Sequence, residues 1–476
     1  MIRASLMSLD DGVHVKVLSK LVRMYGVART VAGICLINKR FAAFVRQPLA
    51  AWKTVVVRRA SARGAAYLAR WLACVAPAVE RLKLDICEAA PYTACLAGAR
   101  ALKVLDVHGP KLKAAELALV GYFTSLTVLR CHCNLADGVE ALGSLVSLKQ
   151  LQQLSITAHK PPAGAQLPPS LSALSALESL SLTTATAQGG FDEPLLYLSL
   201  PWEWCLTATQ VTSMQLDAVD LPLLREHSHG RDINGATSSS SGSSSSIFPA
   251  LRRLELGSAY DRIDTTALGC CQTLEHLKIE LGQTGTAVWA LIAQLSQLQT
   301  LAMHSCYVDA EADVDEGGEP LPLPQSLSSL TSLTTLDIKK SNFHPAMAQL
   351  PAVREMRLCD QSKEFQRVAG WPLPEGPWLR NLEALIILYG GIGSIEAALR
   401  QATRLHTLCI QNCYWLRLRR PELQLLLRLP LRTLMLRRSP QSMYVPEPLL
   451  DEESVCVVEE LSKALKPGVF KLICSY

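Results

Sequence analysis

The amino-acid sequence predicts an α/β solenoid of stacked repeats, with parallel strands on its concave face and a small helical domain at its start. A six-residue phrase, apolar-x-x-apolar-x-apolar, returns along most of the chain, as it does from Leu102, Leu126 and Leu251. Most steps between phrases fall in the 20 to 29 residues typical of one class of solenoid repeat. The chain has 476 residues, which exceeds the size at which a single compact core keeps growing and therefore favours a repeat array.

Each phrase has the chemistry of a strand. Counted from its first apolar residue, it starts fourteen times, at Val79, Leu102, Leu126, Leu151, Leu177, Val211, Leu251, Leu274, Leu298, Leu333, Val353, Leu382, Leu405 and Leu431. Alternation along a strand points the fourth and sixth positions into the core and turns the third, fifth and seventh to the concave side. Phrase and period together indicate leucine-rich repeats, which stack into a horseshoe.

Repeats of this class place Asn or Cys at the ninth position, where the side chain can hydrogen-bond neighbouring backbone along the stack. This chain has such residues at Cys87, Asn134, Cys306 and Cys413. The other repeats have different residues there, so we expect an irregular solenoid.

The repeats are expected to span residues 79–440. Insertions interrupt them near 219–247, 309–324 and 361–378. The first is rich in serine and the second in acidic residues, and both compositions predict solvated loops. The third either packs as a lid over a solenoid edge or fills a groove between repeats. Residues 441–476 are expected to form a C-terminal cap.

Residues 1–60 follow a different, helical pattern, and 61–78 are expected to form a linker or cap helix. The string from Leu36 to Trp52 resembles the second half of an F-box, with Lys39, Arg40 and Phe41 in matching places. The resemblance implies that residues 9–55 dock a Skp-type adaptor. The apolar contacts it implies are Leu9, Val17, Leu18, Leu21, Ile37, Phe41, Phe44, Pro48 and Trp52.

The segment departs from the F-box pattern in three ways. Asp10 follows Leu9 where the family has proline, Asn38 replaces the usual Cys, and the spacing from Leu21 to Ile37 is longer by about five residues. The alternative is a helical cap that covers the open edge of the first repeat, which a solenoid needs in any case.

Charge and cysteine content exclude several classes of protein. Residues 1–78 carry 13 Lys or Arg against two acidic residues, but the bases are scattered without an aromatic stacking pattern, so we expect no nucleic-acid binding. The chain has fifteen cysteines and shows neither a secretory signal nor a long apolar span. Reduced thiols, no membrane partner and a location in cytoplasm or nucleus follow, with cytoskeletal or ciliary association as a further possibility.

The sequence offers no reaction chemistry. It has no phosphate-binding glycine loop followed by lysine, no cysteine pairs at zinc-finger spacing and no spaced nucleophile–base pair. We therefore predict a protein that is not an enzyme and that has no cofactor, no metal and no catalytic residue.

A partner is expected on the concave side. The predicted contact residues are Arg81, Lys83, Asp106, His108, Arg130, His132, His276, Lys278, Ile386, Leu388 and Met435. The last three are apolar at positions that should face solvent, which marks either a contact site or a surface that the third insertion or the C-terminal tail covers.

Two functions fit these features. The first is the substrate-recognition adaptor of a Skp–cullin–F-box ubiquitin ligase, in which the F-box docks the Skp adaptor and the repeats hold a protein target. The alternative is a leucine-rich-repeat interaction scaffold without ligase coupling, in cytoskeletal, ciliary or signalling assemblies.

Overall fold

The structure is a computed structural model, and its strands and helices carry the repeat pattern. It describes residues 52–58, 62–85, 96, 98–162, 164–185, 198–217, 219–220, 248–259, 268, 271–281, 290–304, 329–339, 349–359, 371–373, 375–388, 392–413, 418, 420–438 and 470–474. The chain divides into two compact units, Met1–Pro222 and Leu223–Tyr476.

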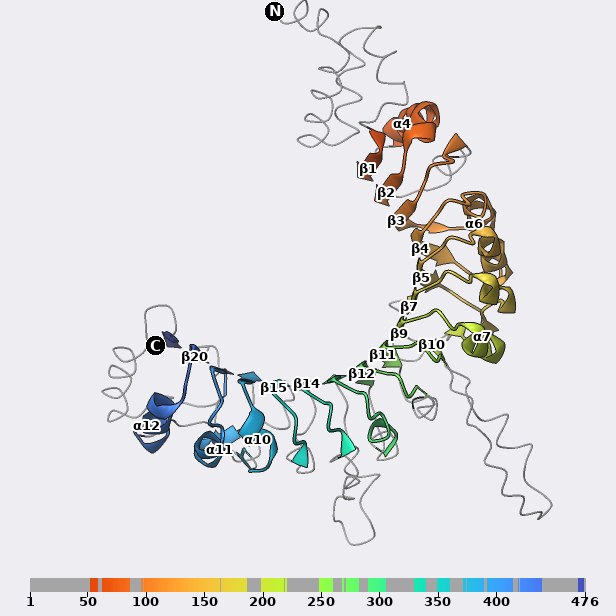
Figure 1. Ribbon diagram of the computed structural model, residues 1–476. Coiled ribbons are helices and arrows are strands. Elements are labelled where there is room, and N and C mark those ends of the chain that lie inside the picture. The colour runs from red at the N-terminus through yellow and green to blue at the C-terminus, as the bar shows by residue number, and fades with distance from the viewer. Residues whose placement is uncertain are drawn as a thin grey trace, which may run out of the picture. The chain divides into compact units, whose positions relative to one another are not determined.

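In the first unit, parallel strands pair side by side in chain order (Figure 1). They are β1 (Thr54–Arg58), β2 (Arg81–Asp85), β3 (Val104–Leu112), β4 (Val128–Asn134), β5 (Gln153–His159), β7 (Ser179–Ala185) and β9 (Ser213–Asp217). The helices are α4 (Ala62–Val75), α6 (Ala114–Val120) and α7 (Trp202–Thr207), with 3₁₀ turns η2 (Ala76–Ala78), η4 (Glu140–Ser147) and η5 (Pro169–Ala173). Short strands β6 (Ala165–Gln166), β8 (Leu198–Ser199) and β10 (Val219–Asp220) form a separate small sheet.

The second unit repeats this plan. Its strands, again parallel, are β11 (Arg253–Ala259), β12 (His276–Leu281), β13 (Thr300–His304), β14 (Thr335–Lys339), β15 (Glu355–Cys359), β17 (Ala384–Leu388), β19 (Thr407–Gln411), β20 (Thr433–Arg438) and β21 (Phe470–Cys474). The helices are α10 (Trp378–Asn381), α11 (Glu396–Gln401) and α12 (Arg420–Arg428), and β16 (Trp371–Pro372) pairs with β18 (Ile392–Ser394).

A strand begins at the third position of every one of the fourteen predicted phrases, from Arg81 in the first to Thr433 in the last. Adjacent strands pair in parallel, and equivalent positions face each other, as Leu154 faces Leu180. The fourth and sixth positions are buried throughout, and the leucines at the first position fill the interior behind the strands. These registers confirm the leucine-rich-repeat solenoid.

Within each unit, main-chain hydrogen bonds join adjacent repeats at one recurring place. The carbonyl oxygen at the second position accepts two N–H groups, from the second and third positions of the following repeat. Gln152 O, for example, accepts from Glu178 N at 2.9 Å and from Ser179 N at 3.0 Å. The same pair of bonds forms at the carbonyls of Lys53, Glu80, Lys103, Thr127, Glu178, Arg252, Glu275, Gln299, Thr334, Arg354, Glu383 and His406.

The ninth-position residues play a smaller part than expected. Cys413 Sγ lies 3.9 Å from the carbonyl oxygen of Ile387 in the preceding repeat, as the prediction requires. Asn134 instead accepts a bond from Ala136 N within its own repeat, at 3.3 Å. Cys87 and Cys306 lie outside the described residues.

The structure corrects the expected helical domain at its end. Residues 54–58 form strand β1, which pairs with β2 from Thr54 opposite Arg81 to Arg58 opposite Asp85. Trp52 therefore occupies the first position of an additional repeat, and Val55 and Val57 fill its inward positions. Trp52, Val55 and Val57 match the apolar phrase, but Trp52 was assigned to the string that resembles an F-box. The expected cap-helix segment contains α4 and η2.

The C-terminal segment also differs from a simple cap. Strand β21 pairs in parallel with β20, with Leu434 opposite Phe470 and Leu436 opposite Leu472. These residues extend the sheet by one more strand. Of the third insertion, the described part ends in β16 and in the buried Trp378 at the start of α10. The serine-rich and acidic loops lie outside the described residues.

We predict that Trp52→Ala destabilises the first repeats by about 3–5 kcal/mol, because it removes a fully buried indole that packs edge-on against Trp71 at 5.1 Å. Hydrogen exchange of the β1 and β2 amides measures the effect. Tyr122→Ala is the control, since that ring is 77% exposed, and it should change stability by less than about 0.5 kcal/mol. Equal effects of the two substitutions would contradict the placement of Trp52.

Candidate functional site: the open face of the strands

We call the side chains at the odd positions of the repeat strands the open face. Burial alternates along each strand, so that in β4 the odd positions Val128, Arg130 and His132 are partly or fully exposed while Leu129 and Cys131 are buried. All eleven predicted contact residues lie on the open face. Arg81, Lys83, Asp106, His108, Arg130 and His132 belong to the first unit, and His276, Lys278, Ile386, Leu388 and Met435 belong to the second.

A buried carboxylate anchors the open face of the first unit. Asp106 is only 9% exposed, although its position in the repeat faces outward. Lys83 Nζ lies 3.1 Å from its Oδ2, and His108 Nε2 lies 2.6 Å from its Oδ1. Burying a carboxylate is costly unless opposite charge or hydrogen bonds compensate it; Lys83 supplies the charge, and His108 contacts the second oxygen. Asp106 is therefore a support for its basic neighbours and presents little surface of its own.

Three imidazole rings touch across β3, β4 and β5. The ring centroids of His108 and His132 are 5.8 Å apart, and those of His132 and His159 are 5.6 Å apart. An irregularity in β3 adds to this row, because pairing skips from Val107 to Lys111, which then lies opposite His132. We call His108, His132 and His159 the histidine row.

The surroundings of the row disfavour positive charge on its inner rings. Burial lowers the pKa of His132, and the nearby His108 and Lys111 lower it further, against the opposing effect of Asp106. Burial likewise lowers the pKa of His159, with Lys111 and His132 acting in the same direction. The Nε2 of His159 has no hydrogen-bond partner among the described residues. Both rings therefore resist protonation while the face is unliganded.

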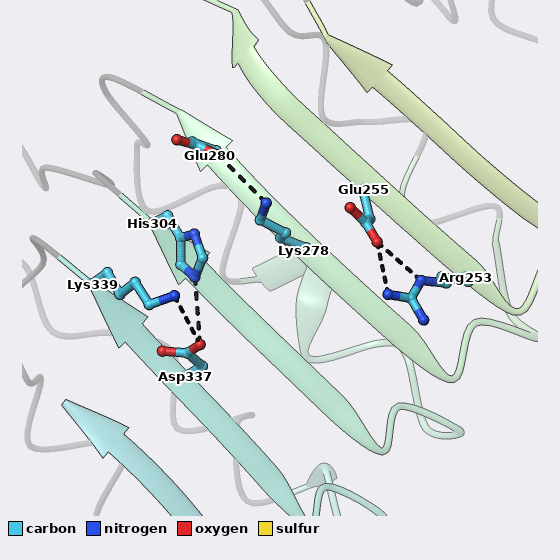
Figure 2. Close-up of polar contacts among 7 residues, drawn as sticks. All are labelled: Arg253, Glu255, Lys278, Glu280, His304, Asp337 and Lys339. Atoms are coloured by element: carbon cyan, nitrogen blue, oxygen red, sulfur yellow. Dashed lines mark hydrogen bonds and ion pairs between the residues drawn. The ribbon is translucent and has the colours of Figure 1, made fainter. Parts of the chain in front are cut away.

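In the second unit the charges of the open face pair with one another, as Figure 2 shows. Arg253 contacts Glu255 on β11 through nitrogen–oxygen distances of 2.8 and 3.0 Å. Lys278 and Glu280 are 3.6 Å apart on β12. Each base has an acid two residues along the same strand, so this part of the face is close to electrically balanced.

Asp337 contacts two basic side chains on the open face of the second unit. Its Oδ2 lies 3.6 Å from His304 Nε2 on β13 and 3.4 Å from Lys339 Nζ on β14 (Figure 2). Burial raises the pKa of Asp337, but the hydrogen bond from His304 and the charge of Lys339 outweigh it, so the net pKa is lowered. The carboxylate is consequently ionised at neutral pH.

Apolar and sulfur-containing side chains follow on β17, β19 and β20. Ile386, Cys409 and Met435 stand opposite one another in register, and each is half-buried. Gln411 Nε2 donates to Met435 Sδ at 3.0 Å and to Cys409 Sγ at 3.2 Å. The described part of the C-terminal tail, β21, continues the sheet beside β20. Residues 439–469 of the tail and 361–370 of the third insertion, which were expected either to cover this row or to leave it free, lie outside the described residues.

Among the predicted adaptor contacts, the structure describes Trp52 alone. Trp52 is fully buried against α4, so it offers no surface to an adaptor in this structure. Leu9, Val17, Leu18, Leu21, Ile37, Phe41, Phe44 and Pro48 lie outside the described residues.

Sequence reasoning missed two members of the first unit's surface. His159 stands at the ninth position of its repeat, beyond the positions considered, but β5 is seven residues long and keeps that position in the strand. Lys111 reaches the face only through the irregularity in β3. For His159 the available signal was a histidine at an odd-numbered position counted from the start of the phrase. For Lys111 the sequence carries no comparable signal.

The residues that the structure describes contain no group of three or more His, Cys, Asp or Glu side chains placed to hold a metal ion. Among the helices within the described ranges, none is long and apolar enough to cross a membrane.

Comparison with known proteins gives structural likeness only. No protein-family model matches the chain, and no curated protein matches it either. Solved structures that resemble it include an internalin from Listeria monocytogenes, with 15% identity over 75% of this chain and 85% of that one and a TM-score of 0.42. A leucine-rich-repeat protein of Leptospira interrogans has 13% identity, coverage of 91% and 99%, and a TM-score of 0.46.

A third resembling structure is the leucine-rich-repeat ectodomain of an Arabidopsis thaliana receptor kinase in complex with Casparian strip integrity factor 2. It has 13% identity over 76% of this chain and 46% of that one, with a TM-score of 0.33. All three are leucine-rich-repeat or repeat-bearing proteins of low identity. The assignment of the fold to this chain rests on its own strand registers.

We predict that the free energy of unfolding falls as the pH drops below the ordinary histidine value of 6.5. Because the pKa values of His132 and His159 are lower in the folded state, these histidines take up protons at a higher pH in the unfolded chain than in the folded one. The free energy of unfolding therefore decreases as the pH falls from 6.5 to the lowered pKa values. Denaturant unfolding at several pH values measures this. His132→Gln/His159→Gln should flatten the profile, and a profile that keeps its slope in this variant would contradict the prediction.

We also predict that Asp337→Asn costs about 1 kcal/mol of stability at neutral pH, because it removes the acceptor shared by His304 and Lys339. The contribution of Asp337 exists above its ordinary pKa of 3.8 and disappears as the pH falls through the lowered value. Wild type and variant should therefore converge in strong acid. A difference that stays constant with pH would assign the loss to packing.

Proposed function

We propose that this chain is a leucine-rich-repeat scaffold that binds a protein partner on the open face of its strands. The supporting observation is the row of Ile386, Cys409 and Met435 across three adjacent strands, at positions whose equivalents elsewhere are mostly polar. Apolar side chains gathered on an outward face favour a contact surface, since exposed apolar patches tend to be interaction sites. The proposal assigns binding to the chain and no reaction.

The charges of the open face support the same proposal. Paired groups such as Arg253 with Glu255 and Lys278 with Glu280 are held in fixed rows by the sheet. Fixed charge patterns contribute more to specificity than to affinity, because they disfavour partners that would bring like charges together. The apolar row would then supply the affinity and the charged rows the selectivity.

A narrower form of the proposal couples the scaffold to a Skp–cullin ligase, with residues 9–55 docking the Skp-type adaptor. It rests on the resemblance of the Leu36-to-Trp52 string to an F-box. The burial of Trp52 removes one of the contacts that this resemblance implies. Co-purification with a Skp adaptor decides it, with an established F-box protein as the positive control. A chain that retains its open-face partner but captures no adaptor is the scaffold without ligase coupling.

We predict that lysine-directed crosslinking of the complex joins the partner to Lys83, Lys278 and Lys339, which lie on the open face. Lys149 serves as the internal control, because it follows η4, away from the repeat strands, and its Nζ donates to Ala173 O at 3.2 Å. Mass spectrometry locates the crosslinks. Their concentration at Lys149 would place the partner elsewhere.

A matched pair of variants tests the apolar row directly. Ile386→Ser/Met435→Ser should weaken partner binding by about 2 kcal/mol, the size of a contact hot spot. Leu425→Ser/Leu429→Ser removes equally half-buried apolar side chains from α12 and its C-terminal end, and it should leave affinity unchanged. Titration calorimetry compares the two, after circular dichroism has shown both to be folded.

A further inference from the structure

Some bases of the open face are paired with acids and others are not. In the second unit Arg253, Lys278 and Lys339 each have an acid within ion-pair distance (Figure 2), whereas the exposed Arg437 on β20 has none among the described residues. In the first unit Arg81, Lys111 and Arg130 are exposed, and none has an acidic side chain within ion-pair distance among the described residues. Asp106 does not serve them, because Lys83 and His108 already occupy its two oxygens. These three bases therefore have no ion pair within the described part of the chain.

The histidine row lies among these uncompensated bases. His132 has His108, Lys111 and Asp106 beside it on β3, Arg130 on its own strand, and His159 on β5. On β7, the strand that follows β5 in the sheet, Thr183 lies opposite Thr157 and Ala185 lies opposite His159. On β2, the strand that precedes β3, Lys83 lies opposite Asp106 and Asp85 lies opposite His108. Among the described residues of β2 to β5, Asp85 is the one outward-facing acid besides the already occupied Asp106.

We propose that the histidine row, together with Lys111 and Arg130, binds an acidic segment of a protein partner, whose carboxylates pair with these exposed bases. The inference rests on the proposed function and names the chemistry of the partner at one part of the open face. Its basis is charge complementarity between a basic, uncompensated surface and an acidic peptide.

The spacing of the row suits an extended peptide. Its rings follow one another at 5.8 and 5.6 Å. Side chains on one side of an extended chain recur every two residues, or about 6.6 to 6.8 Å. A segment that crosses β3, β4 and β5 can therefore bring successive carboxylates to successive rings with small adjustments of side-chain rotamers.

The composition of this surface favours an acidic peptide over a nucleic acid. The outward positions described on β2 to β5 hold no Phe, Tyr or Trp. Proteins that bind single-stranded nucleic acid rely on such rings to stack the bases. Carboxylates need only the positive charge and the N–H donors that are present.

Binding should tighten below neutral pH. In the free protein burial and positive neighbours lower the pKa values of His132 and His159, so both rings are mostly neutral at neutral pH. A bound carboxylate favours the charged imidazole, and binding therefore takes up protons. Affinity rises as the pH falls toward the lowered values, while glutamate side chains stay ionised down to about pH 4.3.

The test uses the full chain and a fluorescent deca-glutamate peptide as the probe, followed by anisotropy. We expect dissociation constants about fivefold lower at about pH 5.8 than at about pH 7.5 at equal ionic strength. His132→Gln/His159→Gln should abolish the difference between the two pH values. His406→Gln changes a histidine of the second unit at a second position, outside the open face, and should preserve it.

A second variant keeps the inference testable if the histidine double variant unfolds. Arg130→Gln alters an exposed side chain, leaves the imidazoles in place, and should weaken peptide binding at both pH values. Absence of peptide binding, equal affinity at both pH values, or full binding by the histidine variant overturns the inference. Tighter binding of deca-thymidylate than of the peptide also overturns it and assigns the surface to nucleic acid.

Failure of this inference is distinguishable from failure of the proposed function. Crosslinks from a partner to Lys278 and Lys339 depend on the second unit alone. They would uphold the scaffold even if the peptide did not bind the histidine row.

Discussion

The structure depends above all on one main-chain arrangement, the second-position carbonyl that accepts two N–H groups of the next repeat. At Glu178 the bonds from Thr212 and Ser213 measure 2.9 and 3.1 Å. The leucines provide the burial that stabilises the stack, but they do not set how one repeat meets the next. The carbonyl does, and it satisfies two donors that would otherwise be unpaired at the start of each strand. The two recurring bonds join main-chain groups, and the hydroxyls that also donate to these carbonyls, those of Thr127, Thr212 and Thr334, stand at second positions. The outward positions are therefore free to carry other chemistry.

That arrangement also shapes the candidate site. Parallel strands in fixed register place outward side chains in rows about 4.8 Å apart. Each charged side chain therefore interacts electrostatically with the side chains of the strands on both sides. The second unit resolves this with acid–base pairs, and Asp337 shows the result in its lowered pKa. The first unit resolves it only around Asp106. The contrast between a balanced and an unbalanced surface on the same scaffold is the main functional information in the fold.

The sequence predicted the repeated part of the structure well because its period is a direct consequence of strand alternation. All fourteen phrases coincide with strands, including the weak ones at Val211 and Val353. The terminal strands escaped because Trp52 was assigned to the F-box-like string and residues 441–476 to a C-terminal cap, whereas β1 and β21 pair as further repeat strands. The link at the second position could not be found from side chains, since its two recurring donors are main-chain N–H groups. Of the site, the odd-position residues were predictable by counting, whereas the contacts among them depend on rotamers and burial.

The irregularity in β3 shows how such a scaffold tolerates a change in length. Pairing with β4 runs from Val104 to Val107 and resumes at Lys111, and Leu112 then faces Cys133 with its side chain buried. The extra residues are absorbed within one strand, and the pairing of β4 with β5 continues undisturbed to its end. An insertion here would leave the buried core residues in place and would alter only the exposed surface. New recognition chemistry could thus arise by lengthening a single strand, with no need to remodel the neighbouring repeats.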